Sequence, residues 1–340
     1  MASGALLGTL LAVLGGIFQG SFALPMKGMQ KHWAWENIWL VYSVVGLICL
    51  PLLLAFATVP ALSDVYANTS LTQFLQVAIY GAGWGIGSTL FGLGISRIGM
   101  ALGFSIILGM TSCLGSLIPM LVLHPADLNT PNGHVLLSGL AVVVVGIVIC
   151  ARAGALRDRD LAAGSSMAKK GAFAAGFVIC IFSGILSPML NIGFSFGEPI
   201  QKAALAHGAA AGMDANAIWV PALAGGFLAN AGYAIYLLFK NKTWSLFTSP
   251  GTTAWHWTGS ALMGALWFGG MSVYGMGTAL MGPLGKVVGW PVFMSINIVT
   301  ANVNGLLSGE WKGARKSSMA VAWGGIALLV LAIIIVRGAA

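Results

Sequence analysis

The chain has 340 residues, of which 58% are hydrophobic and only 7% are charged, and its formal net charge is +8. A soluble domain carries roughly 25% charged residues, so this composition excludes a water-soluble globular protein and indicates an integral membrane protein with several spans. The positive charge is then typical of cytoplasmic loops that face anionic lipid, and it does not indicate a nucleic-acid partner.

Apolar runs long enough to cross a bilayer recur along the chain. A spanning helix needs about 20 predominantly apolar residues. By that measure the sequence predicts an all-α membrane protein with ten transmembrane helices, at residues 4–26, 34–58, 71–95, 98–123, 134–151, 171–194, 217–238, 254–278, 283–307 and 319–336.

A charged connector divides the predicted helices into two blocks of five. The first block is residues 1–152, the cytoplasmic connector is 153–170, and the second block is 171–340. Loops on one side hold 13 Lys and Arg residues, and the other side holds 3. The positive-inside rule places the richer side in the cytoplasm, which predicts a multi-pass protein of the bacterial inner membrane with both termini in the periplasm.

The second block repeats features of the first. Adding 183 to the positions of Gly81, Trp84, Gly87, Gly92, Gly94 and Gly99 gives Gly264, Trp267, Gly270, Gly275, Gly277 and Gly282. Two further segments match in the same order, "IFQGSFALPM" with "IFSGILSPM" and "ENIWLVYSVVG" with "NAIWVPALAGG". Because five helices is an odd number, the second copy enters the membrane from the opposite side. The pattern predicts two inverted-topology five-helix repeats, typical of secondary transporters with a site near the midplane.

Small residues spaced four apart, such as Gly83 and Gly87, let helices approach closely in lipid. The tryptophans need another explanation. Trp84 and Trp267 lie inside predicted helices, where they either fill the bundle or form two symmetry-related aromatic walls of a central cavity. Trp39 and Tyr274, which matches Phe91 in the repeat, are further aromatic candidates.

Polar side chains at membrane depth are costly unless they are paired. Four amides in the predicted helices are candidates for binding hydroxyl groups, although interhelical hydrogen bonding explains any one of them: Gln19, Asn191, Asn230 and Asn297. Glu36, near the start of the second predicted helix, either pairs with Lys27, Lys31 or the helix N-terminus, or carries a coupling proton.

No Walker sequence and no nucleophile–base constellation is visible, so neither ATP-driven transport nor an enzyme is indicated. The four cysteines show no metal-ligand spacing. We therefore expect no cofactor and no metal ion.

Four motifs resemble those of the L-rhamnose–proton symporter family, which belongs to the drug/metabolite transporter superfamily of ten-helix carriers. They are "WAWENIW", "GAGWGIG", "FGLGISRIGMALG" and "GEWKGARK". The resemblance covers residues 19 to about 316 and implies import of a deoxyhexose, with L-rhamnose the first candidate, together with a proton. Glu36 would then carry the proton, the four amides would bind sugar hydroxyls, and Trp39, Trp84 and Trp267 would shape the pocket.

Two alternatives remain. The first is an exporter of metabolites or amphipathic drugs from the same superfamily, whose cavity would be wide and lined by methionine and aromatic residues. The second is a membrane enzyme or sensor without transport.

Overall fold

The computed structural model describes residues 2–98, 100–161, 170–283, 285–307 and 311–337. These residues form helices joined by short loops, with no strand among them. The first half consists of α1 (Ala2–Ser21), α2 (Met26–Met29), α3 (Trp35–Val44), the π-helical turn η1 (Val45–Cys49), α4 (Leu50–Thr58), α5 (Leu62–Ala67), α6 (Leu71–Ile98), α7 (Met100–Leu123), the 3-10 turn η2 (Pro125–Asn129) and α8 (Pro131–Leu161).

The second half begins after the part of the connector, residues 162–169, that lies outside the described residues. It consists of α9 (Lys170–Leu186), α10 (Met189–Phe196), α11 (Glu198–Ala206), α12 (Asn216–Lys240), the 3-10 turn η3 (Trp244–Thr248), α13 (Ala254–Leu280), α14 (Gly285–Leu307) and α15 (Lys316–Arg337).

Seven segments of the described chain are long and apolar enough to cross a membrane. They lie in α1, α3 with α4, α8, α9 to α11, α12, α14 and α15. The sequence-based count of ten is not confirmed by this measure. The glycine-rich helices α6 and α13 are not among the seven, because glycine, serine and tryptophan add little hydropathy, and α7 contributes a shorter apolar helix, Ile107–Leu123.

Two proline residues change the predicted helices locally. The sequence predicts one helix over 171–194, but α9 ends at Leu186 and α10 begins at Met189. Pro188 lies at this break, where it disfavours helical geometry in the residue before it. In the second predicted helix, η1 directly precedes the segment containing Pro51. Proline cannot donate the usual helical hydrogen bond, and a π-helical turn accommodates such an interruption.

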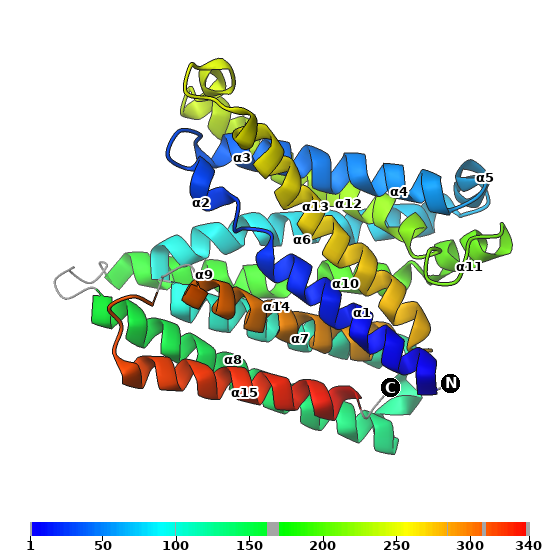
Figure 1. The fold of residues 1–340 in the computed structure, drawn as a ribbon. Helices are drawn as coiled ribbons and strands as arrows, with labels where there is room; N and C mark the ends of the chain where they lie inside the picture. The colour runs from blue at the N-terminus through cyan, green and yellow to red at the C-terminus, as the bar shows by residue number, and fades with distance from the viewer. Residues whose placement is uncertain (1, 99, 162–169, 284, 308–310, 338–340) are drawn as a thin grey trace.

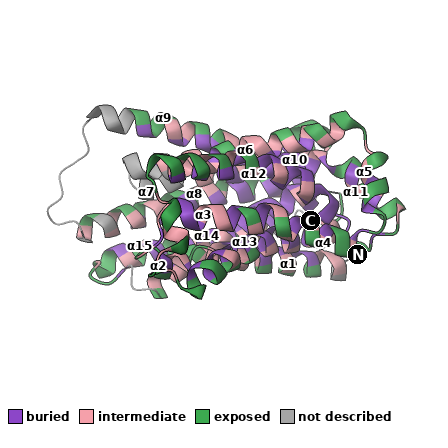
Figure 2. Ribbon diagram, turned by 90° about the horizontal axis from the view of Figure 1, so that it is seen from above, coloured by how far each residue is buried: buried purple, intermediate pink, exposed green. Residues whose placement is uncertain are grey.

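The long helices run side by side and form one bundle (Figure 1). α8 and α15 form one edge, α3, α4 and α12 form the opposite edge, and α1, α6, α7, α9, α13 and α14 lie between them. Figure 2 shows buried residues along the inner faces of the helices and exposed residues along the outside. Many of the exposed residues are large and apolar, as expected for a surface that faces lipid.

The contacts between the two halves come in matching sets. α1 packs on α13 and α14, while α9 packs on α6 and α7. α3, η1 and α4 pack on α13, while α12 packs on α6. The remaining large contacts join helices at the same position in each half, namely α8 with α15, α7 with α14, and α3 with α12.

Helices at the same position in the two halves run in opposite directions where they touch. Trp39 of α3 bonds to Asn230 of α12, whereas Thr58 at the end of α4 bonds to Asn216 at the start of α12. In α8, Gly139 faces Val336 and the later residue Gly146 faces the earlier residue Leu329. Both pairs of helices are therefore antiparallel.

Glycine brings the backbones of α6 and α12 into contact. A Cβ atom at Gly81 would collide with the carbonyl oxygen of Ala222, and one at Gly225 would collide with that of Ala78. Gly83 and Gly87 instead pack against residues at the break between α9 and α10. The glycines of α6 thus permit close approach on two sides of the helix.

Charged residues gather at the end of the bundle where α8 and α12 end and α15 begins. There the Asp160 carboxylate accepts hydrogen bonds from the Ser318 hydroxyl (2.6 Å) and the Arg315 backbone N–H (3.0 Å). It also forms an ion pair with the Arg315 guanidinium (3.1 Å). These interactions lower the pKa of Asp160. The opposite end carries α5, α11, the start of α1 and the end of α15 (Figure 1).

Candidate functional site

The predicted sugar-contacting residues meet one another in pairs. The first pair is Trp39 and Asn230, where the indole N–H donates to the amide oxygen at 3.0 Å. The Ser88 hydroxyl donates to the same oxygen at 2.9 Å, and the Asn230 amide nitrogen donates to the Gly226 carbonyl. One amide therefore links α3, α6 and α12.

Gln19 and Asn297 form the second pair. The Asn297 amide nitrogen donates to the Gln19 side-chain oxygen at 2.7 Å and so connects α14 to α1. This bond also crosses between the two halves of the chain.

Asn191 and Tyr274 form the third pair, and both are fully buried. The Tyr274 hydroxyl donates to the Asn191 side-chain oxygen. The Asn191 amide nitrogen donates to the carbonyl oxygens of Gly115 (2.8 Å) and Lys286 (3.4 Å). The pair thus connects α10 and α13 to α7 and α14.

The last pair is Trp84 and Trp267, the two tryptophans matched in the predicted repeat. Their rings stack with centroids 5.0 Å apart and planes at 27°. Trp267 also contacts Tyr42 edge to face at 6.3 Å, and Tyr42 lies 4.8 Å from Trp39. A row of aromatic rings therefore runs from α6 through α13 to α3, and it ends at the Asn230 amide.

Glu36 lies in the first turn of α3 and is only 4% exposed. Its carboxylate accepts hydrogen bonds from the Asn241 amide (2.9 Å) and the Thr243 hydroxyl (2.8 Å), just beyond the end of α12. Within the side chains that the structure describes, Glu36 forms these hydrogen bonds and no ion pair. The predicted partner Lys27 lies outside the described side chains. The carboxylate therefore ties the start of α3 to the end of α12.

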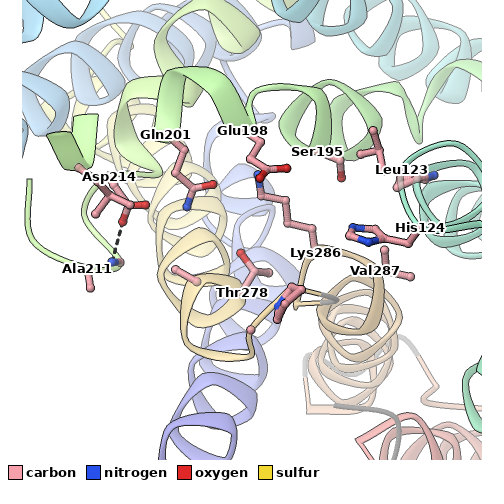
Figure 3. A pocket seen from close by; sticks show the side chains of 16 residues that line it. Leu123, His124, Ser195, Glu198, Gln201, Ala211, Asp214, Thr278, Lys286 and Val287 are labelled. Carbon is pink, nitrogen blue, oxygen red and sulfur yellow. Dashed lines mark hydrogen bonds between the residues drawn. The ribbon is translucent and has the colours of Figure 1, made fainter. Parts of the chain in front are cut away.

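A pocket of about 260 Å³ lies at the end of the bundle that carries α11 (Figure 3). It is enclosed by the end of α7, by α10 and α11, by the end of α13 and by the start of α14. The polar side chains that line it are His124, Ser195, Glu198, Gln201, Asp214, Thr278 and Lys286.

Lys286 connects this pocket to the third pair. Its ammonium donates to the Phe194 carbonyl oxygen at 3.2 Å and lies 4.6 Å from the centre of the Phe194 ring. That ring stacks on Trp219 with centroids 4.3 Å apart. The Lys286 backbone carbonyl accepts the Tyr274 hydroxyl at 3.2 Å. The pocket and the buried Asn191–Tyr274 pair therefore share one residue.

Sequence reasoning missed the charged residues of this pocket. These residues are Glu198, Asp214 and Lys286, and none of them is among the site candidates that the sequence predicts. One signal was available, since Lys286 is one of only 3 cations on the side predicted to lack them. A cation in or near a membrane span is a candidate for function when it lies on the side that the positive-inside rule leaves poor in Lys and Arg.

Within the residues that the structure describes, no three His, Cys, Asp or Glu side chains gather closely enough to hold a metal ion. The chemistry available at the paired residues and the pocket is hydrogen bonding, aromatic contact and charge.

Comparison with known proteins gives a consistent result. The family model described as L-rhamnose-proton symport protein (RhaT) matches residues 1–340. Similar curated proteins named L-rhamnose-proton symporter come from Citrobacter koseri (27% identical, 98% of this chain and 97% of the relative), Escherichia coli (28%, 100% of both) and Yersinia pestis (28%, 98% and 97%).

One solved structure, described only as "Crystal structure of protein", has a similar fold. The TM-score is 0.58 at 13% identity, and the match covers 96% of this chain and 95% of that one. At this identity the likeness concerns the fold alone.

Proposed function

The chain belongs to the L-rhamnose-proton symport protein family, and we propose that it is a secondary transporter that imports a deoxyhexose, L-rhamnose first, together with a proton. The observation that carries this function is the match of the family model over all 340 residues. The chain is a multi-pass membrane protein of a transporter family and not an enzyme.

We further propose a ten-helix architecture of two inverted five-helix repeats, as in the drug/metabolite transporter superfamily. Two observations support it: the matching sets of contacts between the halves and the antiparallel course of α3–α4 with α12 and of α8 with α15. Two opposed repeats can rock against each other and expose a shared site to either side of the membrane in turn.

The sugar would bind where the halves meet. Three of the four residue pairs bridge the halves directly, namely Trp39–Asn230, Gln19–Asn297 and Trp84–Trp267. An amide bonded to another amide can exchange that partner for a sugar hydroxyl at little net cost, because one hydrogen bond replaces another. An indole face offers an apolar surface to the CH groups of the sugar.

Glu36 is the proposed proton carrier. It is a buried acid at a contact between equivalent helices, and its hydrogen bonds to Asn241 and Thr243 hold α3 against α12. Protonation would weaken these bonds, since a neutral carboxyl is a poorer acceptor than a carboxylate. Loading a proton would therefore loosen one end of the bundle.

The proposed orientation follows from charge. The end where α8 and α12 terminate and α15 begins would face the cytoplasm, and the end with α5, α11 and both termini would face the periplasm of a bacterial inner membrane. The approximately 260 Å³ pocket then opens outward.

Uptake by the purified chain in proteoliposomes tests the function. We expect labelled L-rhamnose to accumulate when the outside is made acidic and to stop accumulating when a proton ionophore is added. Uptake that ignores the pH gradient would overturn the proton coupling. Efflux of an unrelated metabolite or drug without rhamnose uptake would favour the exporter.

A further inference from the structure

The pocket at the α11 end carries charged residues for which the proposed function names no role. Glu198 and Asp214 line the same pocket as Lys286, although neither carboxylate forms an ion pair with the Lys286 ammonium within the described residues. Figure 3 shows the Lys286 side chain reaching from α14 toward Glu198 on α11. The two elements therefore present opposite charges across one cavity.

Lys286 has hydrogen-bonding capacity left over. An ammonium has three N–H donors. One of them donates to the Phe194 carbonyl, the ring below supplies a cation–π contact, and no other hydrogen bond from this nitrogen to the described residues exists. The remaining donors are available to oxygen atoms of a molecule in the pocket.

The acceptors lie opposite. Asp214 is buried, and one of its carboxylate oxygens accepts the Gly212 backbone N–H at 2.6 Å. Glu198 lies at the rim and pairs with Lys202 at 2.8 Å, both side chains being at least half exposed. Lys286 and Asp214, inside the pocket, carry opposite formal charges. Glu198 and Lys202, at the rim, do so as well, and the net formal charge of these four residues is therefore zero.

A cavity with balanced charge attracts neither an anion nor a cation by net charge, yet it offers strong donors and acceptors to neutral hydroxyl groups. Its volume of about 260 Å³ lies just below the usual range of small-molecule pockets, roughly 300–1,000 Å³. A single monosaccharide ring suits that space.

We propose that this pocket is an outward-facing binding site for one uncharged monosaccharide, in which Lys286 donates hydrogen bonds to sugar oxygens and the Asp214 and Glu198 carboxylates accept hydrogen bonds from sugar hydroxyls. The site excludes sugars that carry a carboxylate, because an added negative charge would lie beside two carboxylates without a new cation. This assignment deepens the proposed sugar transport and rests on it. The Lys286 backbone carbonyl accepts the Tyr274 hydroxyl, so the pocket adjoins the buried Asn191–Tyr274 pair.

Protection of a cysteine from labelling tests the proposal without requiring transport. Ala279 lines the pocket and is partly exposed, so Ala279→Cys introduces a small reporter there. The purified full chain in detergent would be labelled with a maleimide in the presence of L-rhamnose, D-glucose or D-galacturonate. The unmodified chain gives the background of the native cysteines, of which Cys49 is exposed. Ser63→Cys, exposed on α5 at the same end, is the matched control.

We expect L-rhamnose to slow labelling of Ala279→Cys at least about 5-fold, D-galacturonate to leave it unchanged, and neither sugar to affect Ser63→Cys. In a second measurement, Lys286→Met should raise the Kd for L-rhamnose about 10- to 100-fold, as for loss of hydrogen bonds to a charged group. The cysteine result stands even where Lys286→Met fails to fold.

The failures are distinguishable. A chain that transports L-rhamnose but shows no protection of Ala279→Cys overturns the pocket and leaves the transport function intact. A chain that does not transport L-rhamnose overturns the proposed function, and protection by D-glucose would still support a neutral-sugar pocket. Equal protection by D-galacturonate contradicts the charge argument.

Discussion

Trp84 and Trp267 are 183 positions apart in the chain, and their indole rings stack with centroids 5.0 Å apart. The sequence predicts them as two walls of a cavity, and in this conformation they contact each other directly. A sugar that used both faces would have to separate them. In the proposed transport cycle, the stacked pair would be a closed arrangement of the site, and the two rings would separate when the sugar binds.

Replacing either tryptophan tests this role. Trp84→Ala and Trp267→Ala should each raise the Kd for L-rhamnose about 2- to 10-fold, because an aromatic contact contributes about 0.5–1.5 kcal/mol. Binding of labelled sugar to purified protein measures the effect. Trp323→Ala, at a site 52% exposed on α15, is the matched control. If protein yield falls as much as binding does, the tryptophans serve packing alone.

Glu36→Gln tests the proton carrier. Glutamine keeps an oxygen that accepts from Asn241 and Thr243 but cannot be charged. We expect accumulation driven by a pH gradient to disappear while exchange of labelled for unlabelled L-rhamnose continues. Asp64→Asn, an exposed acid in α5, should change neither. Unchanged concentrative uptake by Glu36→Gln would rule this residue out.

Close packing of α6 on α12 predicts a stability effect that is independent of transport. Gly81→Ala should lower the free energy of unfolding by about 1–3 kcal/mol, since its methyl group would collide with the Ala222 backbone. Gly232→Ala in α12 meets nothing within 4 Å and should be neutral or slightly stabilising. Thermal unfolding in detergent compares the two variants. Equal unfolding temperatures would contradict the packing.

The Asp160 contact predicts a pH dependence of stability. Its pKa is lowered in the folded chain by the Ser318 hydroxyl and the Arg315 backbone N–H. The contact is therefore fully stabilising above the unfolded pKa of about 3.9 and is lost as the pH falls through the lower folded pKa. Unfolding temperatures of the unmodified chain and Asp160→Asn should differ at pH 7 and converge under acid conditions. A constant difference down to pH 3 would contradict this assignment.

The apolar pattern predicts where most helices lie, because each run that must cross lipid is continuous in sequence. It misplaces boundaries where the helix continues beyond the apolar run. Helix α8 extends to Leu161 through charged residues that the sequence assigns to a connector. Pro188 indicates a helix break before α10. The apolar run continues across this proline, so an assignment by hydropathy alone predicts one helix there.

The partners of the candidate residues were not predictable. Gln19 and Asn297 bond across a separation of 278 residues, and no local pattern encodes such a contact. The same holds for Glu198, Asp214 and Lys286, which lie near separate helix ends in sequence and around one pocket in space. The predicted repeat proposes which helices correspond, but tertiary packing determines which side chains meet.

The coupled movement of sugar and proton is the central claim, and the electrical current on sugar addition tests it most directly. Proteoliposomes carrying the chain would receive a pulse of L-rhamnose with no pH gradient imposed. We predict a transient inward positive current that rises with sugar concentration, is absent for D-galacturonate, and falls sharply in Glu36→Gln. L-rhamnose entry without any current or change of internal pH would contradict the account.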